Sequence, residues 1–164
     1  MISGEGPQPA LGMVIGEAPG RDEIKYGRPF VGKAGSLLDT ALHAVGIQRD
    51  EVYITNVVKE LPLDSDGKIR RPTPGEVLDW WPILEGEIAS TAPAAILCLG
   101  RTAGNAVAHH LYGLEGDVPF KTALGGQAFV AWHPAYLLRG GHGSAGYRDW
   151  LAQLLPWAEA VIRA

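Results

Sequence analysis

Short apolar runs recur along the chain, each a few residues long and rich in residues that favour extended backbone. A run of this length, bounded by glycine, proline or polar residues, predicts a strand. The runs are continuously apolar rather than alternating, which is typical of strands buried on both faces of a mainly parallel sheet. The strands that we expect are Leu11–Ile15, Val52–Thr55, Ala95–Leu99 and Ala128–Trp132.

Between these runs, apolar residues recur with the period of an α-helix. The helices that we expect are Ala34–Val45, Pro74–Ala89, Thr102–Leu111 and Tyr147–Arg163. The alternation of strands and helices predicts an α/β fold, a three-layer α/β/α sandwich around a central four-stranded, mainly parallel sheet. No linker divides the sequence, so we expect one domain over residues 1–164.

Composition limits the class of protein. The chain has 164 residues, of which 46% are hydrophobic and 20% are charged, as expected of a globular domain. Its formal net charge of −4 argues, taken alone, against a partner as acidic as nucleic acid. The sequence starts without a signal-like segment and contains no apolar run near the roughly 18 residues that span a bilayer, so we expect a cytoplasmic protein without membrane contact.

Cysteine and histidine usage bears on metal binding. Cys98 is the only cysteine, which excludes an internal disulfide, a multi-cysteine zinc site and an all-cysteine iron-sulfur cluster within this chain. The five histidines form no metal-binding pattern, and we therefore expect no metal.

Polar side chains follow three of the four expected strands. Glu17 comes after the first strand, Asn56 after the second and His133 after the fourth. In open α/β sheets, ligands bind beyond the carboxyl ends of the strands, so these side chains are expected to converge. A carboxylate, an amide and an imidazole at one sheet edge predict an active site for a planar, hydrogen-bonding ligand.

Four segments, in this order, closely resemble the family 4 uracil-DNA glycosylases: Gly16–Gly20, Gly27–Gly35, Val52–Lys59 and His133–Arg139. The resemblance covers about 130 residues of the 164. It implies the family's fold of a parallel sheet between helices. It also implies hydrolysis of the bond between uracil and deoxyribose in DNA, which leaves an abasic site for base excision repair of DNA damage.

The resemblance implies a role for each pocket residue. Phe30 would stack on the flipped base, and Asn56 would read the uracil edge by accepting from N3–H and donating to O4. His133 would donate to uracil O2 as the bond breaks, and Glu17 would orient or activate water. Gly16, Ala18 and Glu23 also belong to the substrate pocket; Ala18 stands where other uracil-DNA glycosylases carry a catalytic Asp, and Glu23 lies near the C5 edge.

DNA contacts are expected from three groups of residues. The first resembles the family's minor-groove wedge, an apolar tip followed by a cation. The second lies at the start of a helix, and the third is a basic loop. The residues are Pro134, Leu137, Leu138 and Arg139; Lys33 and Ser36; and Lys68, Arg70 and Arg71. Because charge is segregated along the chain, uracil-containing DNA is the expected partner despite the net charge.

The chain departs from the family at its cluster. Family 4 enzymes hold an iron-sulfur cluster through four cysteines, and Glu60 and Trp80 stand at two of those positions here. We therefore expect no cofactor, and the hypothesis is that Trp80, Trp81 and Leu61 fill the volume with apolar contacts.

Two alternatives stay open. One is a glycosylase for another deaminated or modified base, such as hypoxanthine or 5-hydroxymethyluracil. The other is a non-catalytic module that binds uracil or DNA. In either case the resemblance implies a monomer that acts on DNA in the cytoplasm, in association with the nucleoid.

Overall fold

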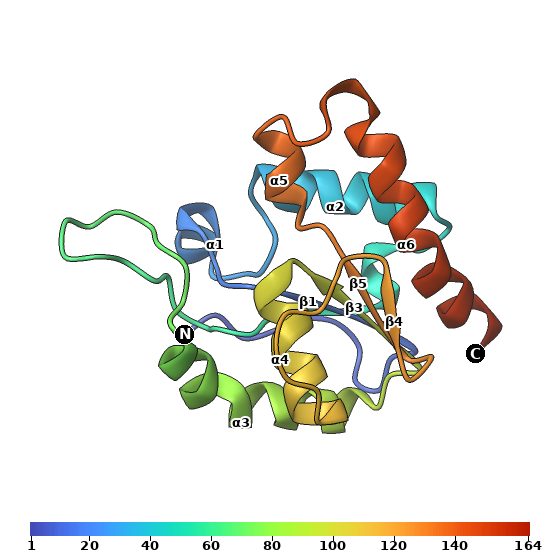
Figure 1. Cartoon of the computed structure of the whole chain (residues 1–164), viewed down its shortest axis with the longest axis horizontal. Coiled ribbons are helices and arrows are strands. Elements are labelled where there is room, and N and C mark those ends of the chain that lie inside the picture. Colours follow the sequence, from blue (N-terminus) through green and yellow to red (C-terminus); the bar gives the residue numbers. More distant parts are fainter.

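A computed structural model describes all residues 1–164, and a five-stranded sheet forms its centre (Figure 1). The strands follow the spatial order β2-β1-β3-β5-β4. They are β1 (Gly12–Gly16), β2 (Tyr53–Asn56), β3 (Ala95–Leu99), β4 (Thr122–Leu124) and β5 (Ala128–Ala131). β2, β1, β3 and β5 run parallel to one another, which confirms the four predicted strands within a residue or two at their ends.

The prediction of four strands missed β4, which pairs antiparallel with β5 at the sheet edge. β4 has only three residues, and its middle residue, Ala123, is exposed. A segment this short and only partly buried carries no apolar run, which is the signal that identified the other strands.

Helices cover both faces of the sheet, as the predicted sandwich requires. The long helices are α2 (Lys33–Ala44), α3 (Pro74–Thr91), α4 (Arg101–Tyr112) and α6 (Gly146–Arg163). One core cluster joins one sheet face to α2 and α6, and the other joins the opposite face to α3 and α4. In Figure 1, α3 and α4 lie below the sheet, and α2 and α6 lie on its other side. None of the helices is both long and apolar enough to cross a membrane.

Side-chain alternation along β1 shows how the layers form. Val14 belongs to the core cluster with α2 and α6, whereas Met13 and Ile15 belong to the cluster with α3 and α4. All three side chains are fully buried. Both faces of this strand are therefore apolar, which explains the continuous apolar run in the sequence.

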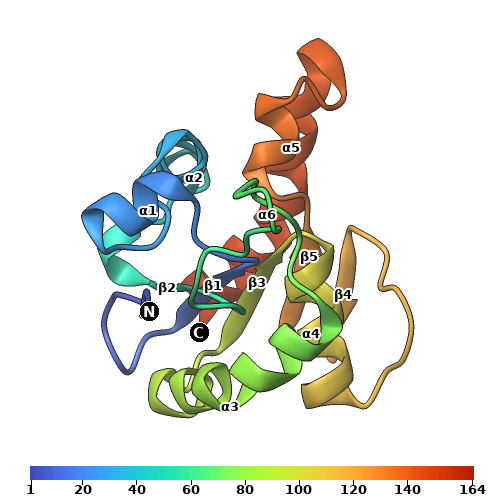
Figure 2. The same cartoon turned by 90° about the vertical axis from the view of Figure 1, so that its left-hand side faces the viewer.

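Two short helices lie beside the sheet's carboxyl edge. They are α1 (Arg21–Tyr26) and α5 (Pro134–Leu138), and two 3-10 turns, η1 (Arg49–Glu51) and η2 (Gly143–Ala145), complete the elements. Figure 2 shows α5 and the turn that follows it extending away from the sheet. Neither short helix was predicted. α1 has no buried residue and therefore no helical period of apolar positions, and α5 spans only five residues.

Candidate functional site

A cavity of about 190 Å³ opens at the carboxyl edge of the sheet. The parallel register pairs Gly16 at the end of β1 with Asn56 at the end of β2. β5 ends nearby and leads into α5 through His133. The residues that line the cavity are Ala18, Gly20, Glu23, Phe30, Ala34, Asn56, His133 and Ala135. The structure thus brings together five of the predicted pocket residues.

Asn56 lines this cavity and carries an unpartnered acceptor atom. Its side chain is 3% exposed, and its Oδ1 atom is buried without a hydrogen-bond partner in the protein. A buried polar atom without a partner is costly, so such atoms in native proteins call for a ligand or water. The free Oδ1 can accept one hydrogen bond from a ligand N–H in the cavity.

Phe30 forms an aromatic wall of the cavity. Its side chain is 5% exposed, and its ring stacks on the His133 ring with centroids 5.7 Å apart. Its backbone has φ of 51°, the left-handed region that a bulky residue adopts at a cost of about 1–3 kcal/mol. Gly16 lies beneath the ring, and a Cβ there would overlap Phe30 and lie 2.5 Å from Asn56 Oδ1.

His133 is held in one protonation form. It caps the N-terminus of α5, where the Ala135 N–H donates to its Nδ1 at 3.1 Å. Nδ1 is therefore the acceptor, and the proton of the neutral ring resides on Nε2. Burial lowers the pKa of His133 from 6.5 to about 4, and Glu17 opposes the shift only in part. At neutral pH the ring is an uncharged Nε2–H donor.

Both backbone polar groups of Trp132, the residue before His133, are fixed by α6. The Trp132 N–H donates to Gln153 Oε1 at 3.0 Å, and Trp150 Nε1 donates to the Trp132 carbonyl at 2.9 Å. Trp150 is fully buried and Gln153 is 6% exposed. The direction of the chain as it enters the site is thus set by two side chains of the C-terminal helix.

Glu17 lies beside the cavity, with its side chain 30% exposed. Thr102 Oγ1 donates to Glu17 Oε1 at 2.5 Å, and Arg71 Nε lies 3.7 Å from the same oxygen. Both contacts involve Oε1, so Oε2 has no protein donor. A carboxylate fixed on one oxygen and partly open to solvent on the other can orient a water molecule.

Glu23 holds the backbone around the cavity. Its Oε1 accepts from the Gly20 N–H at 2.8 Å. Its Oε2 accepts from the N–H groups of Val31 and Gly32 at 3.0 and 2.8 Å. The carboxylate thus fastens the start of α1 to the chain that follows Phe30, while the side chain also lines the cavity.

The residues predicted to form the wedge are divided between core and solvent. Pro134 is buried at the start of α5, and Leu137 packs against the core cluster beneath it. Leu138 is 51% exposed, and Arg139 after it is exposed as well. Leu138 is therefore the apolar side chain of this helix that can reach a partner.

The other residues predicted to contact DNA differ in their exposure and in their ion pairs. Lys33 and Ser36 are exposed in the first turn of α2, and Lys68 is exposed in the loop before α3. Arg71 is 71% exposed. Arg70 is already paired, because its guanidinium donates to both carboxylate oxygens of Glu76 at 2.6 and 3.2 Å.

Two supporting residues were not among the predicted site residues. Thr102, which holds Glu17, lies in the first turn of α4, just after β3 ends, and its place after a strand was its sequence signal. Lys59 is fully buried, and its Nζ donates to the Asn56 carbonyl at 2.5 Å, to Thr55 Oγ1 and to Glu87 Oε1. Burial lowers the pKa of Lys59, and Glu87 opposes that shift. Lys59 thereby anchors the backbone of the asparagine that lines the cavity.

The residues present do not fit an iron-sulfur cluster. Cys98 lies fully buried within β3, burial raises its thiol pKa to about 12, and no second cysteine is present to share a cluster with it. Trp81 is buried and stacks on His110 with ring centroids 4.3 Å apart. Trp80 packs against the core cluster that contains Trp81, and Leu61 is half-buried. No group of three or more His, Cys, Asp or Glu side chains is arranged to hold a metal ion.

Comparison with known proteins assigns the family. The family model of the uracil DNA glycosylase superfamily matches residues 3–155. Relatives described as type-4 uracil-DNA glycosylases share 42% identity in Archaeoglobus fulgidus, 38% in Thermotoga maritima and 39% in Pyrobaculum aerophilum. These matches cover 70%, 85% and 84% of this chain, and 55%, 72% and 73% of the relatives. The chain therefore belongs to the uracil DNA glycosylase superfamily and, within it, to the type-4 uracil-DNA glycosylases.

Proposed function

We propose that this protein is a uracil-DNA glycosylase, a monofunctional hydrolase that removes uracil from DNA and leaves an abasic site. The observation that carries the proposal is the buried, unpartnered Oδ1 of Asn56, a residue that lines one cavity together with Phe30 and His133. Uracil offers an N3–H donor between two carbonyl oxygens. Cytosine has an unprotonated N3 and would place an acceptor against Oδ1, so the site favours uracil.

The first step of the proposed reaction is the departure of the base, which His133 assists. Breaking the bond between C1′ and N1 leaves its electron pair on the uracil, where negative charge spreads to O2. The neutral Nε2–H of His133 can donate to O2, and one such donor contributes about 3–4 kcal/mol to catalysis. A cationic ring is not required, which is consistent with the lowered pKa of His133.

Water completes the hydrolysis on the sugar. The oxygen of water forms the new bond to C1′, and Glu17 Oε2 orients the water or accepts its proton. The carboxylate charge also stabilises the positive charge that develops on the sugar. The departing uracil anion then takes up a proton, so the reaction is balanced without a cofactor.

Access to the base requires the nucleotide to leave the duplex. Flipping one nucleotide costs a few kcal/mol, and an apolar side chain can fill the gap. The exposed Leu138 suits this role. Five further exposed residues would contact phosphates: Lys33, Ser36, Lys68, Arg71 and Arg139. As part of this proposal, the protein acts as a monomer in base excision repair, on DNA of the cytoplasmic nucleoid.

The test is excision from end-labelled oligonucleotides, single- and double-stranded, with alkaline cleavage of abasic sites. The substrates carry uracil, hypoxanthine or 5-hydroxymethyluracil at one position. We expect cleavage at uracil. Cleavage only at another base would assign a different substrate, and binding without cleavage at any base would leave a DNA-binding module.

Variants separate the pocket from the rest of the fold. His133→Ala and Asn56→Ala should each lower the single-turnover rate by about 10²–10³-fold, because each removes one hydrogen bond to the reacting base. The matched control is His43→Ala, since His43 is exposed on α2. Wild-type rates in both pocket variants would refute the assigned pocket.

A further inference from the structure

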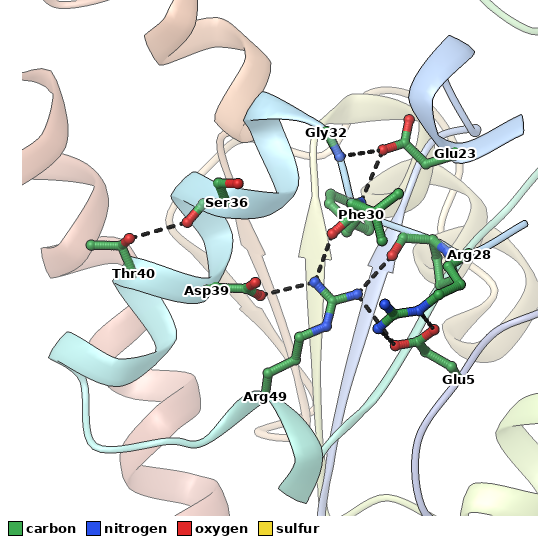
Figure 3. A network of polar contacts seen from close by, with 11 residues as sticks. Glu5, Glu23, Arg28, Phe30, Gly32, Ser36, Asp39, Thr40 and Arg49 are labelled. Atoms are coloured by element: carbon green, nitrogen blue, oxygen red, sulfur yellow. Dashed lines mark hydrogen bonds and ion pairs between the residues drawn. The ribbon is translucent and has the colours of Figure 1, made fainter. Parts of the chain in front are cut away.

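The backbone at Phe30 adopts a conformation that a phenylalanine does not favour. The Phe30 backbone lies in the left-handed region, with φ of 51°, and Gly32, two residues later, caps the N-terminus of α2. A phenylalanine keeps such a conformation only when the surroundings impose it. Figure 3 shows the polar contacts that surround this segment.

Two side chains hold the segment from opposite sides. Glu23 accepts from the N–H groups of Val31 and Gly32, on the side toward α1. Arg49 donates through Nη1 to the Phe30 carbonyl at 2.6 Å and through Nη2 to the Pro29 carbonyl at 2.7 Å. One guanidinium thus bridges the two successive carbonyls at the residue where the chain is left-handed.

Arg49 is itself fixed by charges from two other segments. Its Nη1 donates to Asp39 Oδ1 of α2 at 2.9 Å, and Nη2 lies 3.6 Å from Glu5 Oε2. Glu5 is in turn held by Arg28, which donates to both of its oxygens at 2.8 and 2.7 Å. These contacts lower the pKa of Glu5, with the Arg28 hydrogen bond as the largest cause. The guanidinium is therefore oriented before any ligand binds.

The position of Arg49 in the chain links this clamp to base reading. Arg49 lies in η1, directly before β2, and β2 ends at Asn56. Its side chain is only 18% exposed. Beneath the same segment, a Cβ at Gly35 would collide with the Phe30 carbonyl oxygen. The carbonyl is thus confined between α2 and the Arg49 guanidinium.

We propose that Arg49 is a positioning residue that sets the Phe30 ring against the flipped base by clamping the carbonyls of Pro29 and Phe30. This inference rests on the proposed function, in which Phe30 stacks on uracil. The fork of the guanidinium matters, because a lysine ammonium keeps the charge but cannot bridge two carbonyls in one plane.

The first test is a double-mutant cycle on uracil excision. Arg49→Met should lower kcat/KM by about a hundredfold, as expected for a misplaced pocket group. Arg49→Lys should also lower kcat/KM, by a substantial part of that factor. In a Phe30→Leu background, Arg49→Met should cost less than about threefold, because the ring through which it acts is gone. Equal losses in both backgrounds would overturn the proposal. The control is Arg163→Met, which removes an exposed ion pair on α6.

The second test does not depend on activity. Hydrogen exchange of the Val31 and Gly32 amides should accelerate by tenfold or more in Arg49→Met, while the amides of β3 keep wild-type rates. Unchanged exchange at Val31 and Gly32 would overturn the clamp whether or not the protein excises uracil. Faster exchange together with an inactive wild type would retain the clamp and reject the proposed function.

If Arg49→Met does not fold, Arg49→Lys carries both tests, since it keeps the charge near Asp39 and Glu5. Wild-type kcat/KM and wild-type exchange in Arg49→Lys would show that charge alone suffices, and would overturn the requirement for the fork.

Discussion

The lowered pKa of His133 predicts how the reaction responds to acid. Burial places this pKa at about 4, against 6.5 for an unperturbed histidine. At pH 5 about a tenth of the rings would then be cationic, whereas about 97% would be cationic without the shift. Because Ala135 occupies Nδ1, the uncharged form is the Nε2–H tautomer that can donate to uracil O2.

The assay is single-turnover excision between pH 4.5 and 8, combined with ¹⁵N NMR of His133. The excision rate at pH 5 should remain within about twofold of the rate at pH 7.5, with the loss falling near pH 4. The NMR spectrum at pH 7 should show protonated Nε2 and unprotonated Nδ1. A His133 titration near pH 6.5, or a proton on Nδ1, would refute the reasoning.

The same shift predicts the pH dependence of stability. Above pH 6.5 the ring is neutral in both the folded and unfolded states, so it contributes no pH dependence. Between pH 6.5 and 4 the unfolded state binds a proton that the folded state does not, and stability falls by up to about 3 kcal/mol. Below about pH 4 the loss from this residue levels off. His133→Gln should remove this contribution from urea denaturation curves.

Three further perturbations test the support of the site. Gly16→Ala should reduce kcat/KM by about a hundredfold in a folded protein, because the new Cβ displaces both Phe30 and Asn56; full activity would contradict the close packing. Lys59→Met should cost about 3–5 kcal/mol in urea denaturation by leaving Glu87 buried without its cation, and adding Glu87→Gln should recover part of the loss. Glu23→Gln should accelerate hydrogen exchange in the segment after Phe30, since a carboxylate that accepts three N–H groups is replaced by an amide with one acceptor oxygen.

The sequence predicted the sheet and the place of the site because both depend on strong, local patterns. Runs buried on both faces identified the parallel strands, and strand ends then located Glu17, Asn56 and His133. The rule that ligands bind at the carboxyl edge needs only the order of strands and loops. The structure brings all three side chains to that edge, and two of them line one cavity.

The contacts that hold the site were not predictable in the same way. Arg49 lies 19 residues after Phe30, in a polar turn without periodicity, and its partners come from three separate segments. Counting charges along the sequence also could not show that Arg70 is paired with Glu76. That glutamate belongs to the capping box of α3, and its pKa falls to about 2 chiefly because Arg70 donates to it. Pairing of this kind depends on the folded chain.

The arrangement of Phe30, Arg49 and Asn56 has a consequence for engineering. The Phe30 ring, the Arg49 guanidinium that holds its backbone and the Asn56 amide all lie within residues 28–56, together with α2. A chimaera that exchanges this block whole inherits the three in register, whereas a crossover inside it separates them. The recipient would also need a glycine where β1 ends, because the block closes over that position. The ring, its clamp and the amide are thus inherited as one contiguous stretch of chain, whereas Glu5, Glu23 and His133, which hold or complete the cavity, must come from the recipient.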